Sequence, residues 1–199
     1  MSEIYGKHLD ELKMIQTDLT EKINKIREDM RKEIGMDPVE HCLSRIKDED
    51  SMREKCKRKN LPETPESALF NIKDALGFRI VCAFVDDVFT IRDHIASLDD
   101  YEIIEEKDYI NHAKSNGYRS YHIILRAYGT YYVELQLRTI SMDTWASLEH
   151  HMRYKKEVNN EHLIMLELKR CADELASTDI SMQTIRDMIL GDMKGDKMV

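Results

Sequence analysis

Acidic and cationic side chains that suit phosphate chemistry stand on two predicted strands of this 199-residue chain. Polar and apolar residues alternate over residues 131–138, which predicts a strand with Glu134, Gln136 and Arg138 on one face. Such a face is either a solvated surface or the floor of a polar pocket. Asp74 precedes a second predicted strand and is either a turn residue or, if it meets Glu134 in space, a ligand of Mg²⁺.

A strongly charged stretch, residues 44–60, holds seven lysines and arginines and four acids. If this stretch is helical, four of its side chains share one face: Lys47, Ser51, Lys55 and Arg58. A cationic stripe of this kind can bind a triphosphate. The alternative is a solvated helix without a ligand.

A third stretch, residues 114–122 (KSNGYRSYH), combines a turn with an aromatic residue and several cations. Asn116 and Gly117 predict the turn. Tyr118 could stack on a base while the asparagine hydrogen-bonds a base edge. The side chains available for phosphates are those of Lys114, Arg119 and His122. An ordinary surface loop is the alternative.

The hydrophobic periodicity predicts the elements that must position these side chains. Strands are expected at residues 77–84, 101–107, 120–128 and 131–138, and helices at 86–98 and 140–156, between two terminal helices. The fold class is α/β or α+β, with a mixed sheet of four to five strands flanked by helices.

The two terminal helices each carry an apolar seam that must pack on the central domain or on a second subunit. Gly35 and Pro38 end the first helix. Its seam consists of Leu9, Leu12, Leu19, Ile23, Ile26 and Met30. The second seam consists of Ile164, Leu168, Cys171, Leu175, Met182, Ile185 and Ile189.

Composition excludes several classes of protein. With 42% hydrophobic and 34% charged residues, the chain can build a core and is not disordered. Its net charge of −8 disfavours sequence-independent binding to nucleic acid. Apolar runs are too short for a membrane span, and the N-terminus lacks a secretory signal. Four scattered cysteines suit free thiols in a reducing cytoplasm better than a disulfide framework or a zinc site.

Taken in order, five motifs resemble the synthetase domain of the RelA/SpoT family, and most closely its stand-alone small alarmone synthetases. They cover residues 45–155, more than half the chain, and favour the functional interpretation of each stretch. The motifs are Arg45-Ile46-Lys47 with Ser51, Glu54-Lys55 and Arg58; residues 74–79 (DALGFR); residues 116–122 (NGYRSYH); residues 133–139 (VELQLRT); and residues 142–150 (MDTWASLEH) followed by Tyr154-Lys155.

The resemblance implies a nucleotidyltransferase-like enzyme that moves pyrophosphate from ATP to the 3′-hydroxyl of GTP or GDP. The products would be pppGpp or ppGpp, and AMP. It implies Mg²⁺ on Asp74 and Glu134, with Glu134 also the base, and Tyr118 stacked on guanine. It assigns ATP to Arg45, Lys47, Ser51, Lys55, Arg58 and Arg79, and the rest of the acceptor site to Lys114, Asn116, His122, Gln136 and Arg138.

The chain is expected to divide into an N-terminal helix (1–35), a synthetase domain (36–158) and a C-terminal helical extension (159–199). The resemblance further suggests a homotetramer built through the terminal helices. Two departures qualify it. Three acids, Asp48-Glu49-Asp50, either weaken ATP binding or face solvent, and His41 replaces an aromatic residue of product-activated relatives. Activation by the enzyme's own product therefore stays open. The sequence also leaves open the acceptor preference and a regulatory ligand, (p)ppGpp or RNA. The alternatives are a non-catalytic guanine-nucleotide or RNA-binding regulator, and a toxin-type enzyme acting on adenosine nucleotides or tRNA.

Overall fold

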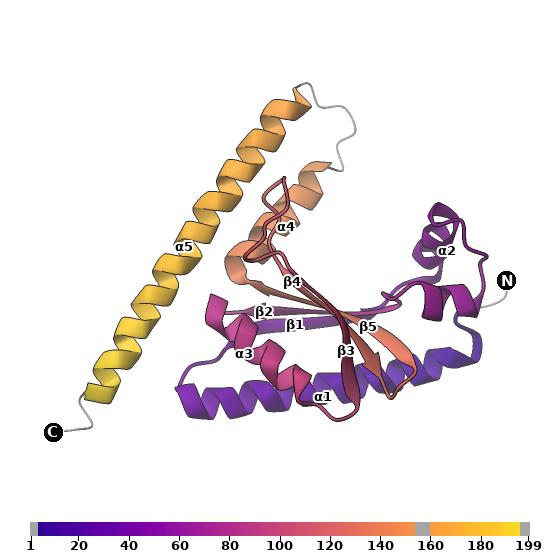
Figure 1. The fold of residues 1–199 in the computed structure, drawn as a ribbon, viewed down its shortest axis with the longest axis horizontal. Coiled ribbons are helices and arrows are strands. Elements are labelled where there is room, and N and C mark those ends of the chain that lie inside the picture. Colours follow the sequence, from indigo (N-terminus) through magenta and orange to yellow (C-terminus); the bar gives the residue numbers. More distant parts are fainter. Residues whose placement is uncertain (1–3, 154–159, 196–199) are drawn as a thin grey trace.

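The computed structural model describes residues 4–153 and 160–195 and has the predicted α+β architecture (Figure 1). The strands are β1 (Val39–Ile46), β2 (Leu76–Cys82), β3 (Tyr101–Asp108), β4 (Tyr121–Ala127) and β5 (Tyr131–Thr139). The helices are α1 (Leu9–Ile34), α2 (Glu49–Arg58), α3 (Val85–Ala96), α4 (Ile140–Arg153) and α5 (Glu161–Gly195), with a short 3₁₀ helix η1 (Gly6–His8) and a short π-helix η2 (Ser67–Asn71). The last residues of the helix predicted over 140–156 lie outside the described part of the chain.

The five strands form one mixed sheet in the order β1-β2-β5-β4-β3. Only β2 and β5 run parallel to each other, with Gly77 opposite Glu134 and Arg79 opposite Gln136. On the other side of β5, His122 of β4 lies opposite Gln136. Because paired residues point to the same side of a sheet, the polar side chains of β2, β4 and β5 share one face.

Helices α1 and α3 cover the opposite, apolar face of the sheet, while α2 and α4 lie on the polar side (Figure 1). The first seam is buried on the protein's own core, including Leu12, Leu19 and Ile23. Each of these side chains contributes about 1.5–3 kcal/mol when fully buried. α1 stops at Ile34 before Gly35, whose φ of 80° is a left-handed conformation that favours glycine, so Gly35 ends the helix as predicted. The first seam is therefore intramolecular.

Residues 39–46, for which no strand was predicted, form the edge strand β1. A register shift between Val39 and His41 breaks the alternation that marks a strand in sequence. The idea of one helix over residues 44–60 is consequently wrong for its first residues, because α2 begins only at Glu49. Lys47 lies in the turn between β1 and α2.

The second seam is only partly covered by the rest of the chain. α5 packs against α4 and α3, and Ile164, Leu168 and Leu175 are half-buried there. The remaining seam residues are exposed: Cys171, Met182, Ile185 and Ile189. In residues 4–153 and 160–195, none of the helices is both long and apolar enough to cross a membrane.

Candidate active site

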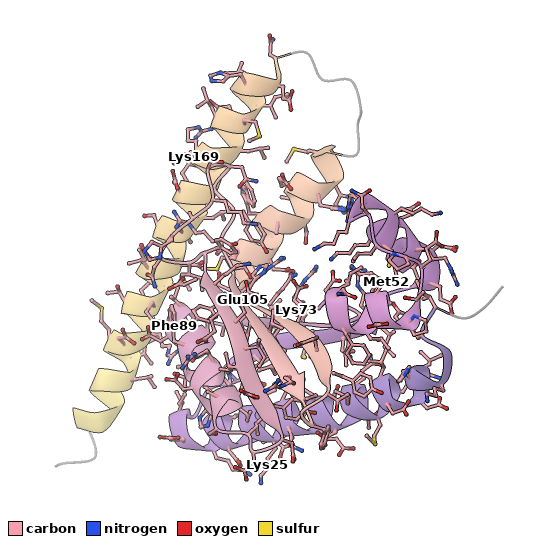
Figure 2. All side chains as sticks on the ribbon, turned by 45° about the vertical axis from the view of Figure 1, so that its right-hand side comes forward. Lys25, Met52, Lys73, Phe89, Glu105 and Lys169 are labelled. Carbon is pink, nitrogen blue, oxygen red and sulfur yellow. The ribbon has the colours of Figure 1, made fainter. Side chains whose placement is uncertain are left out.

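A cavity of about 310 Å³ opens on the polar face of the sheet, between β3–β5 and the segment from α2 to β2. Asp74 and Glu134 both line it, although they are far apart in sequence. The parallel pairing of β2 with β5 explains this, since Asp74 lies just before the strand end that Glu134 faces. Three lysines that the sequence reasoning missed line it as well: Lys59, Lys73 and Lys107. Figure 2 labels Lys73 together with its ion-pair partner Glu105, 3.8 Å away.

Asp74 is held by two lysines through one of its oxygens. Lys47 Nζ donates to Oδ2 over 2.6 Å, and Lys55 Nζ donates to the same oxygen. Burial alone would raise the pKa of Asp74, but these hydrogen bonds and charges outweigh it, so the pKa lies below its ordinary value. The other oxygen, Oδ1, is buried without a hydrogen-bond partner among the described residues. Asp74 is therefore an anion with an oxygen free to bind a cation.

Glu134 begins a line of polar contacts along β5. Gln136 Nε2 donates to Glu134 Oε2 over 3.1 Å, and Arg138 Nη2 donates to Gln136 Oε1 over 2.7 Å. The buried Arg138 guanidinium also donates to Asp143 Oδ1 over 3.1 Å, and Arg79 lies 3.5 Å from the same carboxylate. Asp143 of α4 thus joins two predicted site arginines. It stands inside the 142–150 motif, but nothing in the sequence shows that it meets both.

The loop of residues 114–120, the Tyr118 loop, meets this line at its far end. Arg138 Nη2 donates to the Tyr118 hydroxyl over 2.7 Å, and His122 Nε2 lies 2.9 Å from the same oxygen. Lys114 Nζ and the Arg138 guanidinium lie over the Tyr118 ring, 4.8 and 5.3 Å from its centre. Five predicted acceptor-side residues are thereby brought together: Lys114, Tyr118, His122, Gln136 and Arg138.

Two residues of the Tyr118 loop serve the loop itself. The Asn116 side chain accepts from the Tyr118 backbone N–H over 3.2 Å and so closes the turn. Arg119 does not face the cavity as a phosphate ligand would. It donates to the Ile110 carbonyl over 3.0 Å and to Asp173 of α5 over 3.1 Å, because its side chain points to the α5 side of the loop.

His122 is a neutral side chain in this network. Burial, and then the charges of Arg138, Lys114 and Lys107, lower its pKa to about 4. Since Arg138 can only donate to the Tyr118 hydroxyl, that hydroxyl is free to donate to an unprotonated His122 Nε2.

The lowered pKa of His122 makes stability depend on pH. An unfolded histidine titrates near 6.5, so between about pH 4 and 6.5 the unfolded state binds more protons, and stability rises with pH. Replacing His122 with asparagine should remove about 2 kcal/mol of that rise, measured by urea unfolding at pH 4.5 and 7. The exposed His94 is the control, and an equal effect of His94→Asn would contradict the assignment.

The remaining residues that the resemblance assigns to ATP lie nearer to solvent. Arg45 is exposed on β1 opposite Gly77, which places it on the polar face, while Ser51 and Arg58 are exposed on α2. The three acids belong to the start of α2, where anions are favoured. Asp48 caps the helix by accepting from Ser51 N over 2.9 Å, and Glu49 accepts from the Ile4 and Arg53 N–H groups.

The carboxylates at the cavity suit a magnesium ion only when a phosphate-bearing ligand supplies further oxygens. Among the described residues, no group of three or more His, Cys, Asp or Glu side chains could hold a metal. Two carboxylates are available instead, one of them with the unpartnered buried oxygen of Asp74. Magnesium accepts this arrangement when phosphate oxygens and waters complete its octahedron.

Comparisons with known proteins agree with this geometry. The family model described as "Region found in RelA / SpoT proteins" matches residues 44–159. Two relatives from Bacillus subtilis (strain 168) are similar over most of the chain. GTP pyrophosphokinase YjbM is 31% identical, and the match covers 92% of this chain and 85% of the relative. GTP pyrophosphokinase YwaC is 34% identical, and the match covers 83% of this chain and 89% of the relative. The crystal structure of small alarmone synthetase 1 from Bacillus subtilis bound to its product pppGpp superposes with a TM-score of 0.76, at 30% identity, covering 89% of this chain and 94% of that one.

Proposed function

This chain belongs to the RelA/SpoT family, and we propose that it is a GTP pyrophosphokinase, which transfers pyrophosphate from ATP to the 3′-hydroxyl of GTP or GDP. The observation that carries the proposal is the shared cavity of Asp74 and Glu134, with lysines on its walls. Transfer of a phosphoryl-type group asks the protein mainly to position the reactants and neutralise charge. This cavity offers cations for the phosphates and a carboxylate for the hydroxyl.

The donor nucleotide needs cations because ATP brings several negative charges. Lys47 and Lys55 converge on Asp74, and because each ammonium group has three donors, phosphate oxygens can bind them alongside the carboxylate. Arg45 on the polar face, with Arg58 and Ser51 on α2, extends this cationic wall toward solvent. Arg79, held near Asp143, lies between the donor and acceptor sides.

Mg²⁺ fits the free oxygen of Asp74 together with Glu134, and when bound it would neutralise phosphate charge. The protein's own residues fix both carboxylates before any ligand arrives. Lysines anchor one oxygen of Asp74, and Gln136 anchors one oxygen of Glu134. This leaves the other oxygen of each carboxylate for the reactants.

Glu134 is the base in this proposal. The 3′-oxygen of the acceptor forms a bond to the β-phosphorus of ATP, and the bond from that phosphorus to the α,β-bridging oxygen breaks, so AMP leaves. The proton of the 3′-hydroxyl passes to Glu134. A base on a strand, held by its neighbour Gln136, has the fixed geometry that such a transfer needs.

The guanine nucleotide binds at the Tyr118 loop. Cations occupy the faces of the Tyr118 ring, and a stacked guanine would take the place of one of them. Lys114, displaced from the ring, would then be available for the acceptor phosphates. The neutral His122 and the buried Arg138 hold the Tyr118 hydroxyl, and therefore the plane of the ring, in place.

Assembly and compartment belong to the same proposal. α5 exposes large apolar side chains along much of its length, and a second copy of the chain would cover them in a homotetramer. They include Leu163, Leu166, Ile180 and Met188. All four cysteines are free, and Cys56 and Cys82 are buried, which suits a reducing cytoplasm.

The proposal predicts AMP and a 3′-pyrophosphorylated guanine nucleotide from ATP, GTP and Mg²⁺, detected by mass spectrometry. Chelation of the metal should stop both products together, because one reaction forms them and Mg²⁺ would neutralise the phosphate charge in it. Parallel reactions with GDP, GMP, ATP and tRNA as acceptors separate the toxin-type alternative. Tight guanine-nucleotide binding without any AMP would leave only the non-catalytic alternative.

A further inference from the structure

The Tyr118 loop is seated directly on α5. Gly117 has a φ of 92°, and a Cβ at this residue would lie 2.6 Å from the Cβ of Ala172 and 3.2 Å from the Cα of Lys169. Only glycine fits such a left-handed conformation at so close an approach. The contact also requires a small residue on the helix, and the buried Ala172 provides it.

Two polar contacts beside that approach end on α5, one from the loop itself and one from α4. Arg119 Nη2 donates to Asp173 Oδ1 over 3.1 Å, so the residue that follows Tyr118 is tied to α5. Trp145 of α4 donates its indole N–H to the Leu168 carbonyl of α5 over 2.8 Å. The ring of the same tryptophan lies edge-on to Tyr118, with centres 6.4 Å apart. α5 therefore fixes both neighbours of Tyr118 and the ring behind it.

The donor side has a different support. Lys47 and Lys55 are held by Asp74, and α2 lies on the far side of the molecule from α5 (Figure 1). A disturbance at Ala172 or Asp173 would thus reach the Tyr118 loop first and leave the ATP cations in place.

We propose that Ala172 and Asp173 of α5 are positioning residues that set the affinity for the acceptor nucleotide by fixing the Tyr118 loop. The inference rests on the proposed function in taking guanine nucleotide as the ligand of that loop. Neither residue touches the cavity, so both act through Gly117 and Arg119.

The test compares kinetic constants for the two nucleotides. Ala172→Leu should raise the KM for GTP about tenfold, because it displaces the loop, and change the KM for ATP less than about twofold. Asp173→Asn should raise the KM for GTP about threefold, as expected for a partly exposed ion pair. Glu174→Gln, which removes a neighbouring charge paired with Arg170 within the helix, should change neither constant.

Trp145, the chain's only tryptophan, gives a readout that does not need turnover. Its fluorescence should report GTP binding beside Tyr118, with dissociation constants that follow the KM values for GTP. If wild-type protein binds GTP without forming product, the proposed chemistry is wrong. The fluorescence titration with GTP still decides the positioning role in that case. If Ala172→Leu does not fold, the comparison of the KM for GTP between Asp173→Asn and Glu174→Gln decides the positioning role. Equal shifts for both nucleotides, or no shift for GTP, overturn the inference.

Discussion

Glu134→Gln is expected to lower kcat about 10⁴-fold, because glutamine can neither take the proton of the 3′-hydroxyl nor offer a charged oxygen to Mg²⁺. The change keeps the size and the alternation of β5, so the folded structure should persist. Release of AMP from ATP and GTP measures the effect, with urea unfolding as the check on folding.

Glu105→Gln is the matched control for this change. Glu105 also lines the cavity, but it pairs with Lys107 and Lys73 on its rim. Its loss should lower kcat less than about tenfold, in the range of an exposed ion pair. If Glu134→Gln kept a tenth of the wild-type rate, Glu134 would be neither the base nor a metal ligand, and the chemistry would have to be assigned to another side chain.

Asp74 and Glu134, the proposed catalytic pair, illustrate what sequence can predict about a site. Alternation over residues 131–138 correctly predicts a polar face that carries Glu134, Gln136 and Arg138, since strand periodicity is a local property. The meeting of Asp74 with Glu134 depends on which strands are neighbours and in what register, which local periodicity does not contain. Residue chemistry raised this meeting as one alternative, and the resemblance to the RelA/SpoT family made it the expectation.

The contacts that sequence missed have non-local causes. The strand β1 is hidden by its register shift, and with it the true start of α2 at Glu49. Arg119 stands in a stretch whose cations were predicted to bind phosphates, yet it pairs with Asp173, 54 residues away. Asp143 joins Arg79 and Arg138 only because α4 returns over the polar face. The contacts of Arg119 and Asp143 depend on where a helix docks rather than on the local sequence pattern.

Arg186 is another such residue, placed inside the apolar seam of α5 between Ile185 and Ile189. The side chain is 10% exposed and its Nη1 lies 2.7 Å from Asp87 Oδ1, while the Asp87 side chain is 2% exposed. Asp87 also accepts from the Phe84 backbone N–H at the start of α3 over 3.2 Å. This pair joins α5 to the core.

Arg186→Met should lower the free energy of unfolding by about 3–5 kcal/mol, because it leaves Asp87 buried without its partner. The loss is measured by urea unfolding.

Arg170→Met, at an exposed ion-paired arginine of the same helix, should cost about 1 kcal/mol or less. Adding Asp87→Asn to Arg186→Met should recover part of the loss, since asparagine removes the unpaired charge and can still accept from Phe84.

The pH dependence of Arg186→Met separates lost charge pairing from lost packing. Burial raises the pKa of Asp87 more than Arg186 lowers it, so removing the arginine should raise that pKa further. A raised pKa means that the folded state binds the extra proton, so the variant gains stability as pH falls and loses it as pH rises through the folded pKa. The difference in free energy of unfolding between Arg186→Met and Arg170→Met should therefore become smaller as the pH is lowered from 7 to 5. A deficit that is constant over this range would mean that the methionine packs badly and that the charge pair contributes little.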